Sequence, residues 1–166
     1  MRTRLGAAGW WGIVGVIAIL GKAIYQLVPV ALRAFDHPLG PAHWITLVVW
    51  VAFMAYSEGY RAFHKAFSPR CVARAHFLAA HPRPLHVALA PLYCMGLLHA
   101  TRKRLIVSWC VALGIVALIV LVRQLEQPWR GIIDGGVVLG LSIGIVSIVY
   151  FAAGKSPSVP PDVPES

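Results

Sequence analysis

Basic side chains that could bind an anion are concentrated between residues 61 and 104. Lysine and arginine clusters beside apolar segments bind the phosphate groups of anionic lipids. The residues predicted to bind anions are Arg61, Lys65, Arg70, Arg74, Arg102, Lys103 and Arg104. Because apolar runs flank this cluster, we expect membrane lipids with anionic headgroups, and not nucleic acid, as its partners.

Two ions of opposite sign lie in otherwise apolar stretches and could form a pair. Lys22 lies inside the first apolar stretch, directly after its most apolar part ends at Gly21, and Asp134 lies about one turn into the last stretch. An ion inside a membrane span is costly and is by default a candidate for function. We therefore consider a Lys22–Asp134 pair, with the alternative that Lys22 extends its amine to the membrane surface.

Glycine recurs at every fourth position of the last apolar stretch, at Gly136, Gly140 and Gly144. Residues four apart share one face of a helix, and glycine there lets a second helix approach closely. The spacing therefore predicts a helix-packing face. The sequence leaves open whether this face meets another span of the same chain or a second copy.

The sequence offers no convincing metal site. One cysteine and three histidines recur every five residues: Cys71, His76, His81 and His86. Five residues rotate successive side chains by about 140° on a helix, so these groups do not share a face. We therefore expect neither a metal nor a cofactor. Motifs for nucleophilic or phosphate chemistry are also absent from the sequence.

The composition indicates the class of protein in which these residues must be placed. Of the 166 residues, 58% are hydrophobic and only 13% are charged, and the mean hydropathy is +0.72. A soluble domain carries more charge, so lipid must cover part of the apolar surface. The net charge of +9 then fits basic residues at the ends of membrane spans. We expect an integral membrane protein.

Four apolar stretches are long enough to cross about 30 Å of hydrocarbon, which takes roughly 20 residues of helix. They cover residues 8–32, 43–60, 105–122 and 131–153. The predicted fold is all-α, a polytopic membrane bundle of four full transmembrane helices in a single domain, residues 1–153. We expect the second helix to leave the membrane after Glu58 and to end at Ser68 and Pro69.

A shorter apolar stretch, residues 85–99, lies inside the basic segment 61–104. As a helix it measures about 22 Å, which is short of a crossing. Four spans leave 11 lysines and arginines on the cytoplasmic side and 3 outside, whereas a fifth span over 85–99 gives 9 and 5. The positive-inside rule favours the first arrangement. We interpret 85–99 as a re-entrant or interfacial helix, with five spans as the alternative.

The last residues, 154–166, contain four prolines among small and acidic residues. Such a segment has little apolar area to bury, so we expect a disordered tail.

Together these features predict a small non-enzymatic protein of the cell (inner) membrane with both termini in the cytoplasm. We expect an accessory or scaffold subunit that acts through segment 61–104, in a homo-oligomer or a larger membrane complex. One alternative is a small oligomeric transporter or channel with Lys22 and Asp134 facing its path. The second is a membrane enzyme for lipid or thiol substrates, with Arg70, Arg74 and His76 as binding residues.

Overall fold

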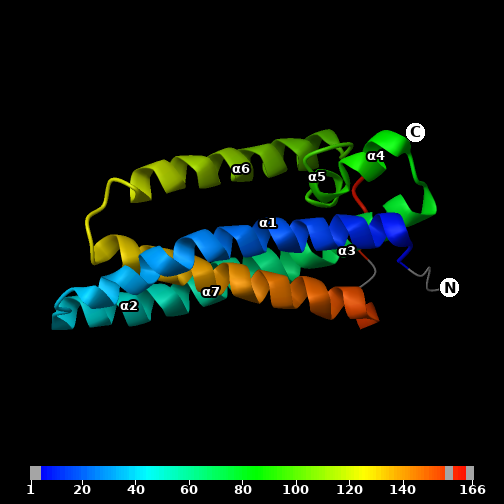
Figure 1. Cartoon of the computed structure of the whole chain (residues 1–166). Helices are drawn as coiled ribbons and strands as arrows, with labels where there is room; N and C mark the ends of the chain where they lie inside the picture. Colours follow the sequence, from blue (N-terminus) through cyan, green and yellow to red (C-terminus); the bar gives the residue numbers. More distant parts are fainter. Residues whose placement is uncertain (1–4, 156–158, 164–166) are drawn as a thin grey trace.

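The computed structural model describes residues 5–155 and 159–163, and every regular element in them is a helix. Three of these helices are long and apolar enough to cross a membrane: Ala7–Asp36, Arg102–Val122 and Trp129–Gly154. Figure 1 shows the long helices lying side by side with roughly parallel axes, while the chain reverses its direction between residues 36 and 41 and again between residues 122 and 129. The predicted all-α class is confirmed, and the three helices indicate a membrane protein.

The first long helix, α1 (Ala7–Leu32), continues into the short 3₁₀ helix η1 (Arg33–Asp36) and agrees with the predicted span 8–32. The chain then turns, and Gly40 in an extended conformation precedes α2 (Pro41–Met54). Proline suits the first position of a helix because the amide hydrogen that it lacks would have no partner there. The side chain of His43 accepts a 3.1 Å hydrogen bond from the Gly40 amide and caps this helix end.

α2 runs on without a break through the π-helical segment η2 (Ala55–Phe67) into α3 (Ser68–Ala80), and we call these elements the α2–η2–α3 column. Phe67 and Ser68 keep right-handed helical dihedrals, so the predicted end at Ser68 and Pro69 is wrong. Pro69 is tolerated because it lies in the first turn of α3. The column ends at His81, where the backbone leaves helical geometry.

Residues 85–99 do not form the single helix predicted for them. The structure has two helices of five residues here, α4 (Pro84–Ala88) and α5 (Ala90–Cys94), separated by the non-helical residue Leu89. Beyond α5, Gly96 and His99 have positive φ angles of 78° and 47°, which end helical winding. Each helix is roughly 7 Å long, so neither can cross a membrane. The expected re-entrant helix is thus replaced by short pieces that pack against α1.

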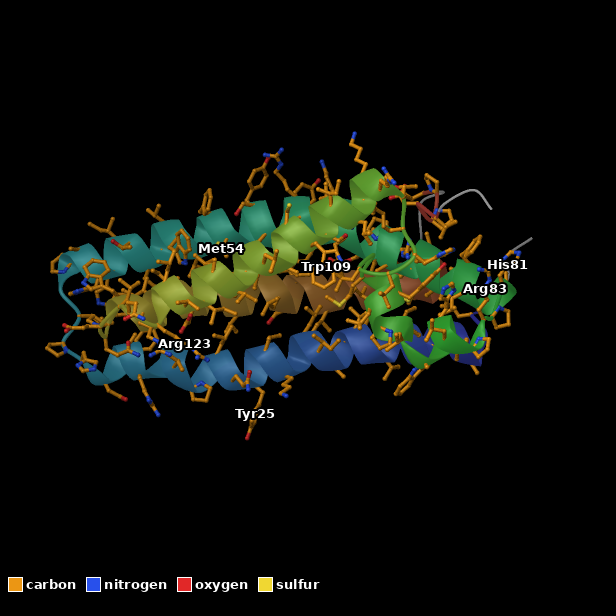
Figure 2. The ribbon with its side chains drawn as sticks, turned by 90° about the horizontal axis from the view of Figure 1, so that it is seen from above. Tyr25, Met54, His81, Arg83, Trp109 and Arg123 are labelled. Carbon is orange, nitrogen blue, oxygen red and sulfur yellow. The ribbon has the colours of Figure 1, made fainter. Side chains whose placement is uncertain are left out.

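α6 (Arg102–Val122) is the one described helix without extensive packing on another helix. Ser108 is its only buried residue, and Trp109, Leu113 and Leu121 are among its many exposed apolar side chains. Figure 1 shows α6 set apart from α1, α2 and α7, and Figure 2 places Trp109 midway along the molecule. A helix that is apolar on all sides requires lipid or other helices around it.

α7 (Trp129–Tyr150) is the central helix, continued by η3 (Phe151–Lys155), and it packs against both α1 and the α2–η2–α3 column. The three predicted glycines face the column, and a Cβ atom on any of them would lie within 3 Å of a column side chain. The closest atoms are on Trp50 for Gly136 at 2.6 Å, Glu58 for Gly140 at 2.8 Å and Phe63 for Gly144 at 2.7 Å. The glycine face therefore meets a helix of the same chain.

The buried core lies at one end of the molecule, where α1, α3, α5 and α7 meet. Its members are Ile13, Val16, Leu20, Cys71, Val72, Ala75, Leu78, Ala90, Tyr93, Cys94, Leu141, Ile148 and Phe151. We call this the basic end, because α3, α4, α5 and the start of α6 carry most of the basic segment 61–104. Seven of the 13 residues of α3 are buried, so this part of the basic segment belongs to the bundle.

The close contact at Gly136 can be tested with alanine. A Cβ atom there would lie 2.6 Å from the ring of Trp50, whose indole nitrogen is held by a 3.1 Å hydrogen bond to the carbonyl of Ile133. We expect Gly136→Ala to destabilise the protein by about 1–3 kcal/mol through overpacking. The measurement is thermal unfolding in detergent.

Gly114 on α6 provides the matched control, because a Cβ atom added there would meet no neighbouring atom within 4 Å. Gly114→Ala should leave the melting temperature unchanged or slightly raised. If both variants melted like the wild type, the close packing of α7 on the column would be contradicted.

Candidate functional site

Arg74, on α3, is the most deeply buried charged side chain in the part of the chain that the structure describes, with 1% of its surface exposed. Its guanidinium group donates to five backbone carbonyl oxygens. The acceptors are Tyr93 at 2.6 Å, Leu98 at 2.7 Å, His99 at 3.2 Å, Pro161 at 3.0 Å and Asp162 at 3.4 Å. The guanidinium carbon also lies 4.4 Å from the centre of the Tyr93 ring, a cation–π contact. These partners compensate for burial of the charge.

Arg74 thus joins three parts of the chain: α3, α5 with the turn that follows it, and the tail. Burial lowers the pKa of Arg74, but an arginine side chain stays protonated in proteins, so the site holds a permanent positive charge. The donors are used inside the protein and do not face a ligand. The structure therefore gives Arg74 a structural place, which differs from the anion-binding role predicted for it.

Residues 159–163 lie in this arrangement, whereas the sequence predicts disorder throughout 154–166. The amide of Thr101 donates to the carbonyl of Asp162 at 3.0 Å, and Val163 packs against the buried core. The segment is ordered because Arg74 and Thr101 supply the hydrogen-bond donors that a proline-rich tail cannot provide for itself. Residues 156–158 and 164–166 of the predicted tail lie outside the described residues.

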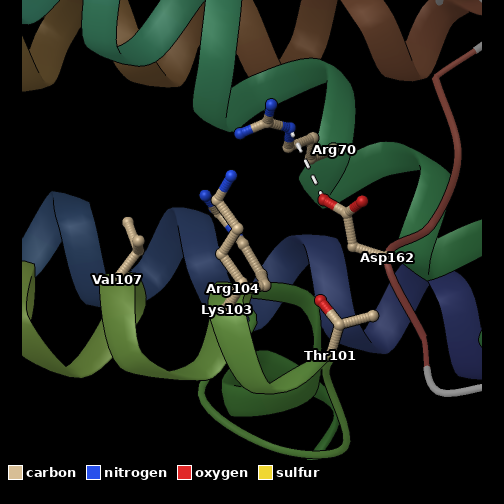
Figure 3. A pocket seen from close by; sticks show the side chains of 6 residues that line it. All are labelled: Arg70, Thr101, Lys103, Arg104, Val107 and Asp162. Carbon is tan, nitrogen blue, oxygen red and sulfur yellow. Dashed lines mark ion pairs between the residues drawn. The ribbon is translucent and has the colours of Figure 1, made fainter.

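A pocket opens beside Arg74, between α3, the start of α6 and the tail. It has a volume of about 290 Å³. Its lining residues, which we call the basic pocket, are Arg70, Thr101, Lys103, Arg104, Val107 and Asp162 (Figure 3). Three of the seven predicted anion-binding residues are therefore brought together from two helices. Sequence reasoning missed Thr101, Val107 and Asp162, because the first two are uncharged and Asp162 is far from the basic cluster in the sequence.

The basic pocket is electrostatically unbalanced. Asp162 is its only acid, and its carboxylate lies 3.6 Å from Nε of Arg70, with both side chains partly exposed. Lys103 and Arg104 are left as two further positive charges, and the N-terminus of α6 adds a partial positive charge. A Cβ atom on Gly96 would lie 3.4 Å from Nε of Arg104, so the turn after α5 packs against this side chain. The pocket is suited to an anion.

No protein family, curated protein or solved structure matches this chain.

The other predicted anion-binding residues lie outside the basic pocket. Arg61 and Lys65 are exposed on η2, and Arg102 is exposed at the start of α6. The Lys65 amine lies 4.7 Å from the centre of the Tyr60 ring. These three cations are available at the surface, where they can contact headgroups without forming a defined pocket.

Lys22 and Asp134 are not brought together as an ion pair. Asp134 is buried and pairs with Arg130, one turn earlier on α7, at 3.8 Å. Lys22 is exposed on α1. The sequence contained this information, since an acid and a base four residues apart lie on one helix face.

The thiols and histidines of the basic end do not form a reactive centre in the described residues. Cys71 and Cys94 are buried, and a hydrogen bond between them together with burial raises the pKa of the Cys71 thiol well above its ordinary value. A protonated thiol is a poor nucleophile. The rings of His86 and His99 lie tilted against each other with centres 4.7 Å apart, and burial, His99 and nearby arginines lower the pKa of His86. No group of three potential metal ligands occurs among the described residues.

The structural place of Arg74 predicts a large effect of a conservative change. Lysine keeps the charge but cannot reproduce a planar fork that reaches five carbonyl groups. We expect Arg74→Lys to destabilise the protein by about 3 kcal/mol or more, because buried carbonyls lose their partners. The measurement is the melting temperature in detergent, together with protease sensitivity of the tail.

Arg70→Lys is the matched control on the same helix. Its ion pair with Asp162 is partly exposed, so the cost should be about 1 kcal/mol or less. Equal melting temperatures for the two variants would refute the structural role of Arg74.

Proposed function

We propose that this chain is a four-span protein of the cell membrane whose basic end contacts anionic headgroups on the cytoplasmic side. The observation that carries the proposal is the convergence of Arg70, Lys103 and Arg104 in one pocket at the end of the bundle. Positively charged segments of membrane proteins remain in the cytoplasm. Since α1 begins and residues 159–163 lie at this same end, the proposal places both termini there as well (Figure 1).

The fourth crossing in this proposal is α2 with the first residues of η2. Residues 41–60 give about 30 Å of helix, enough for the hydrocarbon core. Ile45, Val48, Val49 and Phe53 are exposed apolar side chains on this stretch, as expected for a surface that faces lipid. An even number of crossings returns the chain to its starting side, which agrees with the position of residues 159–163 in Figure 1.

The proposed role is that of an accessory or scaffold subunit in a homo-oligomer or larger membrane complex. The basic pocket combines cations, a hydroxyl group and a carboxylate paired with a cation, which suits binding more than bond-making. The transporter alternative relied on Lys22 and Asp134, but Asp134 pairs with Arg130 in the structure and Lys22 is exposed. The enzyme alternative relied in part on Arg74, whose donors are occupied.

The four-span topology can be tested by labelling cysteines with a membrane-impermeant maleimide. In a Cys110→Ser background, which removes the exposed thiol, we expect Asp36→Cys to be labelled on intact cells. His81→Cys should be labelled only after permeabilisation, since the proposal places it in the cytoplasm. Both positions are exposed, so access to reagent is decided by the membrane. Labelling of both positions from the same side would contradict a crossing by α2.

Headgroup contact can be tested in nanodiscs of equal parts phosphatidylglycerol and phosphatidylcholine, by native mass spectrometry of the lipids that stay bound. We expect the wild type to retain phosphatidylglycerol preferentially. Replacing the exposed cations Arg61, Lys65 and Arg102 by glutamine should reduce this preference. Each cation that lies at the membrane surface should account for about a fivefold change. Arg33→Gln removes one exposed cation at the opposite headgroup layer, so it should lower the preference by only about fivefold and serves as the single-cation reference for the triple variant. Equal retention of both lipids by the wild type would refute the proposed function.

A further inference from the structure

We propose that the basic pocket is a single site for the phosphate group of an anionic phospholipid, and that Asp162 holds this site when no lipid is bound. The inference rests on the proposed function. It adds a defined binding site and a competing group supplied by the chain itself.

The donors of the basic pocket match a phosphate group. Arg70 approaches from α3, and Lys103 and Arg104 approach from α6, while the Thr101 side chain adds a hydroxyl group (Figure 3). A guanidinium group can donate two parallel hydrogen bonds to the oxygens of one phosphate group, whereas an ammonium group attracts the phosphate as a point charge. The volume of about 290 Å³ leaves room for a phosphate group with some of its bound water.

Asp162 marks the position at which an anion is already accepted. Its carboxylate neutralises one of the three cations and lies 3.6 Å from Nε of Arg70. A charge-assisted hydrogen bond is about 2.7–2.9 Å long, so this contact is loose. Ion pairs between partly exposed side chains stabilise by little, and an anion that engages all three cations can displace the carboxylate.

The tail need not leave for this exchange to occur. Its backbone is held independently, by hydrogen bonds from Arg74 to the carbonyls of Pro161 and Asp162 and from the amide of Thr101 to Asp162. Rotation of the Asp162 side chain is enough to free Arg70. Replacing the Asp162 carboxylate by an amide of the same shape therefore removes its competition with the lipid and leaves the backbone hydrogen bonds of the tail in place.

The apolar wall of the pocket favours a lipid over a free phosphate. Val107 lines the pocket one turn beyond Lys103 and is 43% exposed. It leads onto the exposed apolar surface of α6, including Ile106 and Val111, which the described helices do not cover. An acyl chain leaving a phosphate group in the pocket can follow this surface, whereas a water-soluble phosphate gains nothing from it.

The test is a titration of the full chain in detergent with dioctanoyl phosphatidic acid, followed by native mass spectrometry. We expect saturable binding of one lipid. Asp162→Asn should tighten this binding about two- to fivefold, because the competing charge is gone. Glu126→Gln, an equal charge change in the connection between α6 and α7, should leave it unchanged. Arg70→Gln and Lys103→Gln should weaken it, and Lys103 is exposed, so its replacement leaves the fold intact.

Several results would overturn the proposal. Unchanged or weaker binding by Asp162→Asn, with wild-type melting, would exclude competition by Asp162. Unchanged lipid binding by Lys103→Gln would exclude the basic pocket as the binding site, even if Asp162→Asn were too unstable to test. Inorganic phosphate binding as tightly as phosphatidic acid, or equal binding of dioctanoyl phosphatidylcholine, would exclude an anionic lipid as the preferred ligand. In each case a wild-type preference for phosphatidylglycerol in nanodiscs would leave the proposed function standing.

Discussion

The burial of one guanidinium group determines how the basic end is built. A charge that is 1% exposed is tolerable only if its hydrogen-bonding capacity is used, and Arg74 uses it on carbonyls of α5, of the turn after it and of the tail. Four of those carbonyls, of Leu98, His99, Pro161 and Asp162, belong to irregular segments, and the fifth, of Tyr93, lies in the last turn of α5. Arg74 thus finds acceptors for its buried donors, and the irregular segments find donors for their carbonyl groups. The tail residue Asp162 and the turn that leads to Thr101 owe their positions to this arrangement.

The parts of the fold that were predictable are those determined locally. Long apolar runs define α1, α6 and α7 to within a few residues, because length and hydropathy decide whether a helix can lie in a membrane. The glycine face of α7 was predictable in the same way, from glycines that recur every four residues. Which helix it meets depends on how the chain folds back, and no periodicity contains that information.

The parts that were not predictable depend on contacts between distant segments. Arg70 and Arg74 are one turn apart on α3 and equally basic, so the sequence treats them alike. The packing of α5 buries the second and leaves the first partly exposed. The tail likewise becomes ordered through partners more than 80 residues away. The continuation of α2 through Pro69 shows that a local stop signal can be overridden when proline falls in the first turn of the next helical segment.

The isolation of α6 has a mechanical consequence. Its tilt is not fixed by neighbouring helices, and in a bilayer the tilt of a lone helix follows the hydrophobic thickness of the membrane. The start of α6 is held at the basic end, because the Thr101 amide is bonded to the carbonyl of Asp162 and the turn after α5 packs against Arg104. The remainder of the helix has no buried residue beyond Ser108. A change of tilt therefore turns α6 about the basic pocket, so the far end of the helix moves most and the cations of the pocket move least.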